Sequence, residues 1–377
     1  MTIRNLGPIK DMTLDLRQVN VLIGDQGTGK STVAKVLAAV KHMLNETSLA
    51  DSPHHHIMRE GKPATEKDFN IIWQDDFAKW LDWTGLTNYV YPDSFISFKN
   101  EEYSFLYDNG EINIKSTDTD FDTLRTPVDM YIPAYREVAI VLKDKLFAIL
   151  QAKATLPDIL TRFGTGFLEA RVKKTLYDYR DVFGVMYRHD KGIDYILLGD
   201  GKQIEIEDAS SALRNGVPML VVFDNALMNR HQQVSIYTSY HYPYCPYLIL
   251  EEPELNCFPE TQYKLTKYFI EGIKEDEGYR NHLFITTHSP YILTSLNNLM
   301  QAYQTGKAEP EKADVIISKR YWLNPDDVSA YMLLDGTCKD IMDRAENLIV
   351  AEEIDSVSRK LNAEFNELLK LEINAPV

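Results

Sequence analysis

Short apolar runs that end in polar residues alternate along this chain with segments of helical periodicity. The runs Val19–Ile23, Tyr247–Leu250 and Leu283–Thr286 each have the length and composition of one buried strand. Apolar residues at helical spacing follow the first run, from Val33 to Leu44, and separate the other two over Thr261–Ile273. Strand, helix and strand in succession predict an α/β fold.

Three other segments alternate between apolar and polar residues, which is the period of a strand with one buried face. The first, Met1–Arg17, turns at Gly7-Pro8 and predicts a hairpin. The second is a meander in which Asp108-Asn109-Gly110 is a type I′ turn signal. Its strands are expected at Phe95–Phe98, Tyr103–Tyr107 and Ile112–Ile114, and those of the third segment at Val182–Tyr187, Ile193–Leu198 and Ile204–Ile206.

The remaining segments predict helices and loops. Residues 136–180 follow a short strand, Met130–Ile132, and have a helical pattern that Pro157, Gly164 and Gly166 should break. A surface loop is expected at Asn45–Lys67; its run His54-His55-His56 lacks the spacing of a helical metal site, so we favour solvated side chains there. Near the end, a strand at Val328–Leu333 and a turn at Asp335-Gly336 precede an amphipathic helix with its apolar face between Ile354 and Leu369.

Composition and charge restrict the class of protein. A chain of 377 residues that are 44% hydrophobic can form one elaborated domain or two. Its net charge of −16 argues against a protein that coats nucleic acid over its whole surface. Residues 136–180, however, carry nine Lys/Arg and five Asp/Glu, a net charge of +4 that could bind nucleic acid, solvate a helix face or dock a partner.

We expect a cytoplasmic protein that does not enter a membrane. The sequence has no apolar run of about 18 residues and no signal peptide. Its three cysteines, Cys245, Cys257 and Cys338, lack paired metal spacing and are expected to be buried, reduced thiols.

The first apolar run leads into Gly24-Asp25-Gln26-Gly27-Thr28-Gly29-Lys30-Ser31, which fits the P-loop pattern G-x-x-x-x-G-K-[ST]. Its glycines allow backbone N–H groups to point at phosphate oxygens, and the helix that follows adds its positive N-terminal end. Lys30 can reach the β- and γ-phosphates of ATP, and the Ser31 hydroxyl can take a Mg²⁺ position. We count all residues of Gly24–Ser31, and Thr32 after them, among the nucleotide-binding residues. The Asp25 carboxylate should point outward, because it would otherwise lie uncomfortably close to the phosphates.

A Walker-type ATPase also needs acidic residues at the end of a neighbouring strand. The run Tyr247–Leu250 supplies them, since it ends in Glu251-Glu252-Pro253-Glu254. We assign Glu251 to the Mg²⁺ shell and Glu252 to the general base that polarises the attacking water. A strand that merely ends at a charged surface would look the same, but the P-loop makes that alternative weaker.

Together these motifs resemble the ABC-type ATPase heads of the SMC, RecF and OLD-like families. The resemblance also rests on Ser210-Ser211-Ala212, on Phe258-Pro259 and on Thr287-His288-Ser289-Pro290, and it covers nearly the whole chain. The Glu-Glu-Pro-Glu box is most similar to the OLD-like group. The resemblance implies a single ABC-type domain over 1–377, with a P-loop lobe (1–50), β meanders with the helical insert (51–207), a signature, Walker B and histidine lobe (208–310) and a C-terminal strand and helix (311–377).

This resemblance further implies a homodimer that closes around two ATP molecules. Ser210 and Ser211 of one subunit would contact the γ-phosphate held by the other subunit, and His288 would sense that phosphate beside Glu252. An ordinary helix N-cap for the serines and a capping or core role for His288 are the alternatives.

The sequence departs from the family pattern in three places. Ala212 replaces the usual glycine, which predicts slow hydrolysis or poor dimerisation. No glutamine marks a Q-loop, where Arg136 either contacts the nucleotide instead or forms a structural salt bridge. Residues 335–377 contain neither box of a Toprim nuclease, so we expect no nuclease activity in this chain.

Three functions compete at this point. We favour an ATP-driven dimeric switch that controls a separate effector protein, in antiphage defence or DNA repair. A RecF-like DNA clamp that uses residues 136–180 is the first alternative. The ATPase subunit of an ABC transporter is less favoured, because the helical insert and the long gap between Ser211 and Glu251 are unusual for one.

Overall fold

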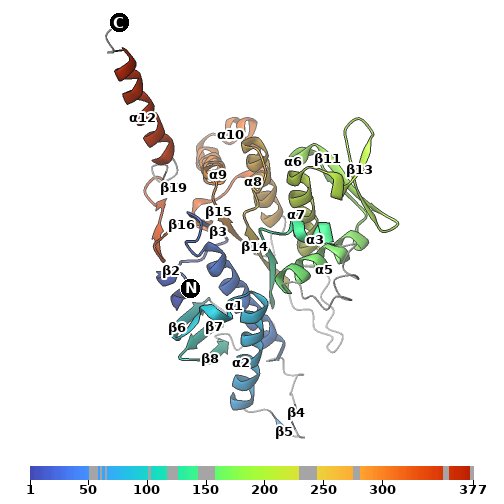
Figure 1. Cartoon of the computed structure of the whole chain (residues 1–377), viewed down its shortest axis with the longest axis vertical. Coiled ribbons are helices and arrows are strands. Elements are labelled where there is room, and N and C mark those ends of the chain that lie inside the picture. Colours follow the sequence, from blue (N-terminus) through green and yellow to red (C-terminus); the bar gives the residue numbers. More distant parts are fainter. Residues whose placement is uncertain are drawn as a thin grey trace.

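The computed structural model describes residues 1–50, 58–59, 62–63, 66–100, 103–116, 126–142, 158–228, 244–274, 281–350 and 356–373. The fold is mixed α/β, and its helices and smaller sheets lie around one central sheet (Figure 1). This confirms the predicted fold class. No helix in the described part of the chain combines the length and apolar character needed to cross a bilayer.

The central sheet has six strands in the order β17-β16-β3-β15-β14-β9. Five of them are parallel, and β17 pairs antiparallel at one edge. The three apolar runs form its inner strands β3 (Val19–Gly24), β15 (His282–Thr287) and β14 (Tyr244–Glu251). The remaining strands are β9 (Thr126–Ile132), β16 (Val328–Leu334) and β17 (Thr337–Asp340).

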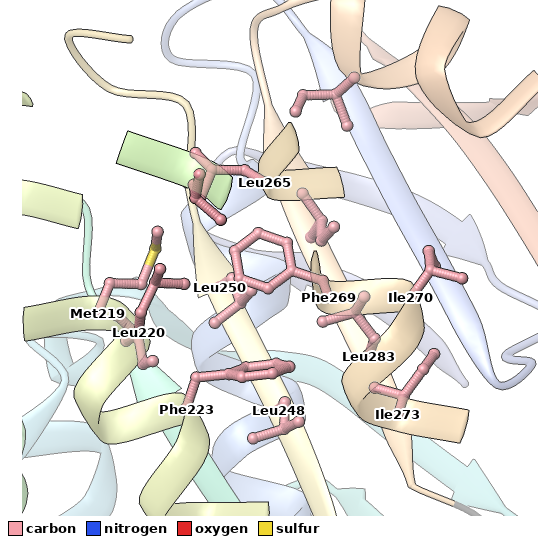
Figure 2. Close-up of a cluster of buried hydrophobic side chains, with 14 of the residues drawn as sticks. Met219, Leu220, Phe223, Leu248, Leu250, Leu265, Phe269, Ile270, Ile273 and Leu283 are labelled. Atoms are coloured by element: carbon pink, nitrogen blue, oxygen red, sulfur yellow. The ribbon is translucent and has the colours of Figure 1, made fainter. Parts of the chain in front are cut away.

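Helices cover both faces of this sheet. On one face, α1 (Lys30–Ala50) and α2 (Glu66–Trp83) pack with Tyr247 and Ile249 of β14. On the other face, α7 (Ser211–Met228), α8 (Pro259–Lys274) and α9 (Pro290–Ala308) pack with Leu248 and Leu250. Figure 2 shows how Phe223 of α7 and Phe269 of α8 meet over β14. Alternate residues of one strand thus serve two cores, which explains its unbroken apolar run.

Two antiparallel sheets flank the centre. The first has the order β2-β1-β6-β7-β8, with positive φ angles at Asn109 and Gly110, as the predicted type I′ turn requires. The second has the order β10-β11-β12-β13. Their strands are β1 (Thr2–Leu6), β2 (Ile9–Thr13), β6 (Val90–Lys99), β7 (Tyr103–Asp108), β8 (Glu111–Ser116), β10 (Leu176–Tyr179), β11 (Val185–Asp190), β12 (Ile193–Leu197) and β13 (Gln203–Glu205).

The helical segment 136–180 differs from its prediction. It contains α3 (Glu137–Leu142) and α5 (Asp158–Lys173), and α5 runs unbroken through Gly164 and Gly166. Phe163, Phe167 and Ala170 of α5 are buried, so packing outweighs the poor helix propensity of glycine. The predicted end of the helical segment was also wrong, because residues 176–179 form strand β10. The predicted strand at Val182 was wrong at its start, because Val182 lies in the short helix α6 (Arg180–Phe183). Pro157 lies outside the described residues.

The expected loop Asn45–Lys67 is shorter than predicted. Helix α1 continues to Ala50, the small strands β4 (Met58–Arg59) and β5 (Lys62–Pro63) pair, and α2 begins at Glu66. His54, His55 and His56 lie outside the described residues. Cys257 and Cys338 are free but only half-buried, which corrects the expectation of full burial.

The C-terminal part forms α10 (Pro310–Ile316), β18 (Met342–Asp343), β19 (Leu348–Ile349) and α12 (Ser356–Ile373). Helix α12 projects away from the body (Figure 1). Its Leu361, Phe365 and Leu368 are exposed. Ile354 lies outside the described residues. Short 3₁₀ helices occur at Thr87–Tyr89, Ile206–Asp208, Lys319–Tyr321 and Pro325–Asp327.

Candidate nucleotide site

The parallel pairing of β3, β15 and β14 brings the predicted motifs to one edge of the central sheet. Thr287 of β15 lies opposite Ile23 of β3, and Glu251 of β14 lies opposite Thr286. The P-loop, the two acidic residues and His288 therefore all follow the carboxyl ends of neighbouring strands. Such an edge is where open α/β sheets bind their ligands.

The glycines of the P-loop are required by its shape. A Cβ on Gly24 would lie 2.8 Å from the Leu333 carbonyl oxygen, and one on Gly29 would lie 2.5 Å from Ile9 Cδ1. Gly27 and Gly29 have φ angles of +77° and +101°, which glycine adopts without strain. The loop thus forms a cradle that side chains would fill, and this fits the phosphates of a nucleotide.

The other P-loop residues are placed as a cradle needs. Asp25 and Gln26 are exposed, as expected for Asp25. The Thr28 hydroxyl donates to the Asp25 carbonyl at 2.8 Å, which closes the turn. Ser31 is exposed at the start of α1, whereas Thr32 is buried.

Lys30 lies at the centre of the site with only 5% of its surface exposed. Its Nζ donates to the carbonyls of Gly24 at 2.7 Å and Asp25 at 2.9 Å, and lies 3.5 Å from His288 Nδ1. Burial lowers the pKa of Lys30, and the carboxylates of Glu252 and Asp25 oppose that shift. The amine is held against the loop by two neutral carbonyl acceptors, which an anionic phosphate could replace.

Glu252 and His288 face each other beside Lys30. The distance from His288 Nε2 to Glu252 Oε1 is 3.1 Å, and the side chains are 32% and 25% exposed respectively. Glu252 has a φ angle of +43°, an uncommon conformation for glutamate, and its N–H donates to the Thr286 carbonyl at 2.9 Å. The structure thus brings together Lys30, His288 and Glu252, the three predicted catalytic residues.

Glu251 is buried behind this row. Its Oε2 accepts the Ala134 N–H at 3.2 Å, whereas Oε1 has no well-formed hydrogen bond. The Tyr131 hydroxyl faces the Glu251 carboxylate without good hydrogen-bond geometry, and burial, followed by the charge and the hydrogen-bonding of Glu251, raises the pKa of Tyr131 well above its usual value. A buried carboxylate oxygen that lacks a firm partner fits a metal ligand.

No group of three His, Cys, Asp or Glu side chains in the described ranges could hold a metal by itself. Mg²⁺ at nucleotide sites is held by one or two protein ligands together with phosphates and water. Ser31 and Glu251 are the residues of this chain that would hold it.

Glu254 has a role at this edge that sequence reasoning did not assign. Its Oε1 accepts the Thr287 hydroxyl at 2.6 Å and the His288 N–H at 3.0 Å. Burial raises the pKa of Glu254, and the bonds from Thr287 and His288 oppose that shift. Glu254 therefore fixes the backbone that carries His288. Its place in the Glu-Glu-Pro-Glu box was the signal available in the sequence.

Arg136 is completely buried. It donates to the carbonyls of Pro133, Asn215, Glu251 and Glu252 at 2.9–3.1 Å. Burial lowers its pKa to about 10, so the side chain stays cationic at neutral pH. These bonds support the structural alternative for Arg136 rather than a nucleotide contact, although its partners are carbonyls and not a carboxylate.

Ser210 and Ser211 lie at the N-terminus of α7, on the opposite face of the central sheet from the P-loop helix α1. Ser210 is exposed, and its carbonyl accepts the Arg214 N–H at 2.9 Å. Their predicted contact with ATP held by a second subunit stays a prediction.

The site can be compared with known proteins. A family model described as an AAA ATPase domain matches residues 1–134 and 141–293. The chain belongs to this AAA ATPase domain family. Membership confirms the P-loop ATPase that the P-loop and the acidic box indicated.

Several solved structures are similar to this AAA ATPase domain. The SMC head domain from Thermotoga maritima is 10% identical with a TM-score of 0.38, covering 90% of this chain and 96% of that chain. The Smc head domain bound to the C-terminal domain of ScpA, from Pyrococcus furiosus, is 8% identical with a TM-score of 0.36, and the coverages are 96% and 98%. RecF-ATPrS of the RecFOR pathway is 11% identical with a TM-score of 0.35, and the coverages are 90% and 96%. A comparison with curated proteins finds no match.

Proposed function

We propose that this AAA ATPase domain binds and hydrolyses ATP and acts as a homodimeric switch. The observation that carries the proposal is the row Lys30, His288 and Glu252 beside the glycine cradle, with successive separations of 3.5 and 3.1 Å. Phosphate would be held by the loop N–H groups and by Lys30. Mg²⁺, when bound with ATP, supplies positive charge to the phosphates, and Ser31 and Glu251 would hold it.

In this proposal Glu252 is the general base. Its carboxylate lies at the partly open side of the site, where a water could approach the phosphate end. His288 orients that carboxylate through Nε2 and would sense the phosphate beside Lys30. Removing the Glu252 negative charge should therefore stop hydrolysis while leaving the phosphate cradle intact.

The surface beside the site supports a second copy of the chain as its cover. Phe258 is 82% exposed and Tyr291 is 50% exposed. Gln262 joins the segments that carry them, because its Nε2 donates to the Cys257 carbonyl and its Oε1 accepts the Ser289 hydroxyl. Exposed aromatic side chains next to a half-open polar site are typical of an interface.

The size of the complex tests the proposal. We expect Glu252→Gln to be monomeric without nucleotide and dimeric with ATP and Mg²⁺, measured by size-exclusion chromatography with light scattering. Lys30→Ala in the Glu252→Gln background is the control, and it should stay monomeric with ATP. A mass of Glu252→Gln that ATP leaves unchanged would contradict the switch.

The output of the switch is the second part of the proposal. On the resemblance to OLD-like ATPases, we propose a separate effector protein, cytoplasmic action, and a role in antiphage defence or DNA repair. Cells that carry Lys30→Ala should lose that function. A Lys30→Ala protein that still protects cells or repairs DNA would refute an ATP-driven switch.

The alternative of a DNA clamp has less support. Cations of segment 136–180 that the structure describes have partners within the chain: Arg136 binds carbonyls, Arg162 and Lys174 lie over aromatic rings, and Arg171 and Arg180 pair with aspartates. ATP-dependent DNA retention that weakens with salt would favour the clamp. No retention at low salt would exclude it.

A further inference from the structure

Two consecutive residues after β9, Arg136 and Glu137, connect parts of the site that are distant in sequence. Arg136 Nη1 donates to the Glu251 carbonyl at 2.9 Å and Nη2 donates to the Glu252 carbonyl at 3.1 Å. Its Nε donates to the Asn215 carbonyl in α7 at 3.1 Å. One rigid guanidinium therefore joins the backbone of both acidic residues to the helix that begins at Ser211.

The Glu137 carboxylate binds two side chains of the same helix. Its Oε1 accepts Arg214 Nε at 2.6 Å and its Oε2 accepts Asn215 Nδ2 at 2.9 Å. Asn215 Nδ2 in turn donates to the Ser211 carbonyl at 3.0 Å. Glu137 thereby fixes the first turn of α7.

These contacts resist movement of the Glu252 backbone relative to the N-terminus of α7. A buried guanidinium that loses a carbonyl acceptor carries the desolvation cost of an unsatisfied charged donor. Glu252 depends on the link further, because its positive φ angle persists only where neighbours hold it. A shift of the α7 N-terminus would therefore displace the Glu252 carbonyl, and a shift of the Glu252 carbonyl would displace the α7 N-terminus.

We propose that Arg136 and Glu137 are positioning residues that make the Glu252 backbone and the Ser210-Ser211 turn move as one unit. The inference rests on the proposed function, in which Ser210 and Ser211 serve the ATP site of the other copy. Within each copy, the link then connects the general base of that copy's own ATP site to the serine turn that serves the ATP site of the other copy. The two sites of a dimer should consequently hydrolyse ATP cooperatively.

The test compares wild-type protein with Glu137→Gln, Arg214→Met and the double variant. We expect a Hill coefficient above one for wild-type ATPase activity and close to one for each variant, with kcat reduced about tenfold and the ATP Kd changed less than about twofold. The double variant should be no slower than the worse single variant, because both changes break the same link. Asp178→Asn, which removes an exposed ion pair with Arg180, is the matched control and should behave as wild type.

Several results would overturn the link. The link is refuted if wild-type protein dimerises with ATP yet hydrolyses it with a Hill coefficient of one. It is also refuted if Glu137→Gln keeps the cooperativity of the wild type. A loss of kcat that only follows a loss of melting temperature would assign Glu137 to folding alone. Failure of the proposed function is distinguished from these, because Glu252→Gln would then show no ATP-dependent dimer at all.

Discussion

Two helical glycines provide a test of the core packing that supports the site. Gly272 of α8 faces α7 so closely that a Cβ would lie 2.8 Å from Phe223 Cε1 and 3.0 Å from Leu227 Cδ1. Gly166 of α5 has nothing within 4 Å of the same position. Neither glycine has a positive φ angle, so alanine fits the backbone at both.

Two opposing effects set the change in the free energy of unfolding that each alanine substitution causes. Alanine in place of glycine stabilises a helix interior by about 1 kcal/mol. At Gly166 this gain should appear in full. At Gly272 the added methyl must displace buried aromatic and leucine atoms, and overpacking of this kind costs about 1–3 kcal/mol. The propensity gain is shared, so the difference between Gly166→Ala and Gly272→Ala isolates the packing cost.

Urea unfolding followed by circular dichroism measures both variants against wild type. We expect Gly166→Ala to be more stable than Gly272→Ala by about 1–3 kcal/mol. Phe223→Leu should relieve part of the strain in Gly272→Ala, which a double-mutant cycle would detect as favourable coupling. Equal stability of the two alanine variants would refute the close approach of α7 and α8.

Three further predictions concern the site. Lys30→Met should abolish binding of a fluorescent ATP analogue without loss of the circular dichroism signal, because Lys30 Nζ lies against the P-loop carbonyls, where it can reach a bound phosphate. Gly29→Ala should weaken that binding at least tenfold, since its φ of +101° strains alanine by about 1–3 kcal/mol; binding equal to wild type would contradict the cradle. Phe258→Asp should weaken the ATP-dependent dimer of Glu252→Gln at least tenfold in analytical ultracentrifugation, about 1.4 kcal/mol, whereas Val315→Asp, on an equally exposed residue of α10, should not.

Patterns of neighbouring residues were enough to predict several parts of this protein. The P-loop was readable because its backbone needs glycine at fixed positions, and the Asp108-Asn109-Gly110 turn because Asn109 and Gly110 adopt positive φ angles. The inner strands were readable because burial on both faces demands an unbroken apolar run. These signals depend on neighbouring residues alone.

The tertiary structure decided what depends on contacts between distant segments. Strand β15 lies between β3 and β14, and only this order sets His288 between Lys30 and Glu252. The same holds for α5, which is helical through its glycines because buried side chains pack around it. Arg136 was ambiguous in the sequence because its four carbonyl partners come from three separate segments. Parallel pairing and buried hydrogen bonds join residues that are tens to hundreds of positions apart, and no local pattern encodes such a partner.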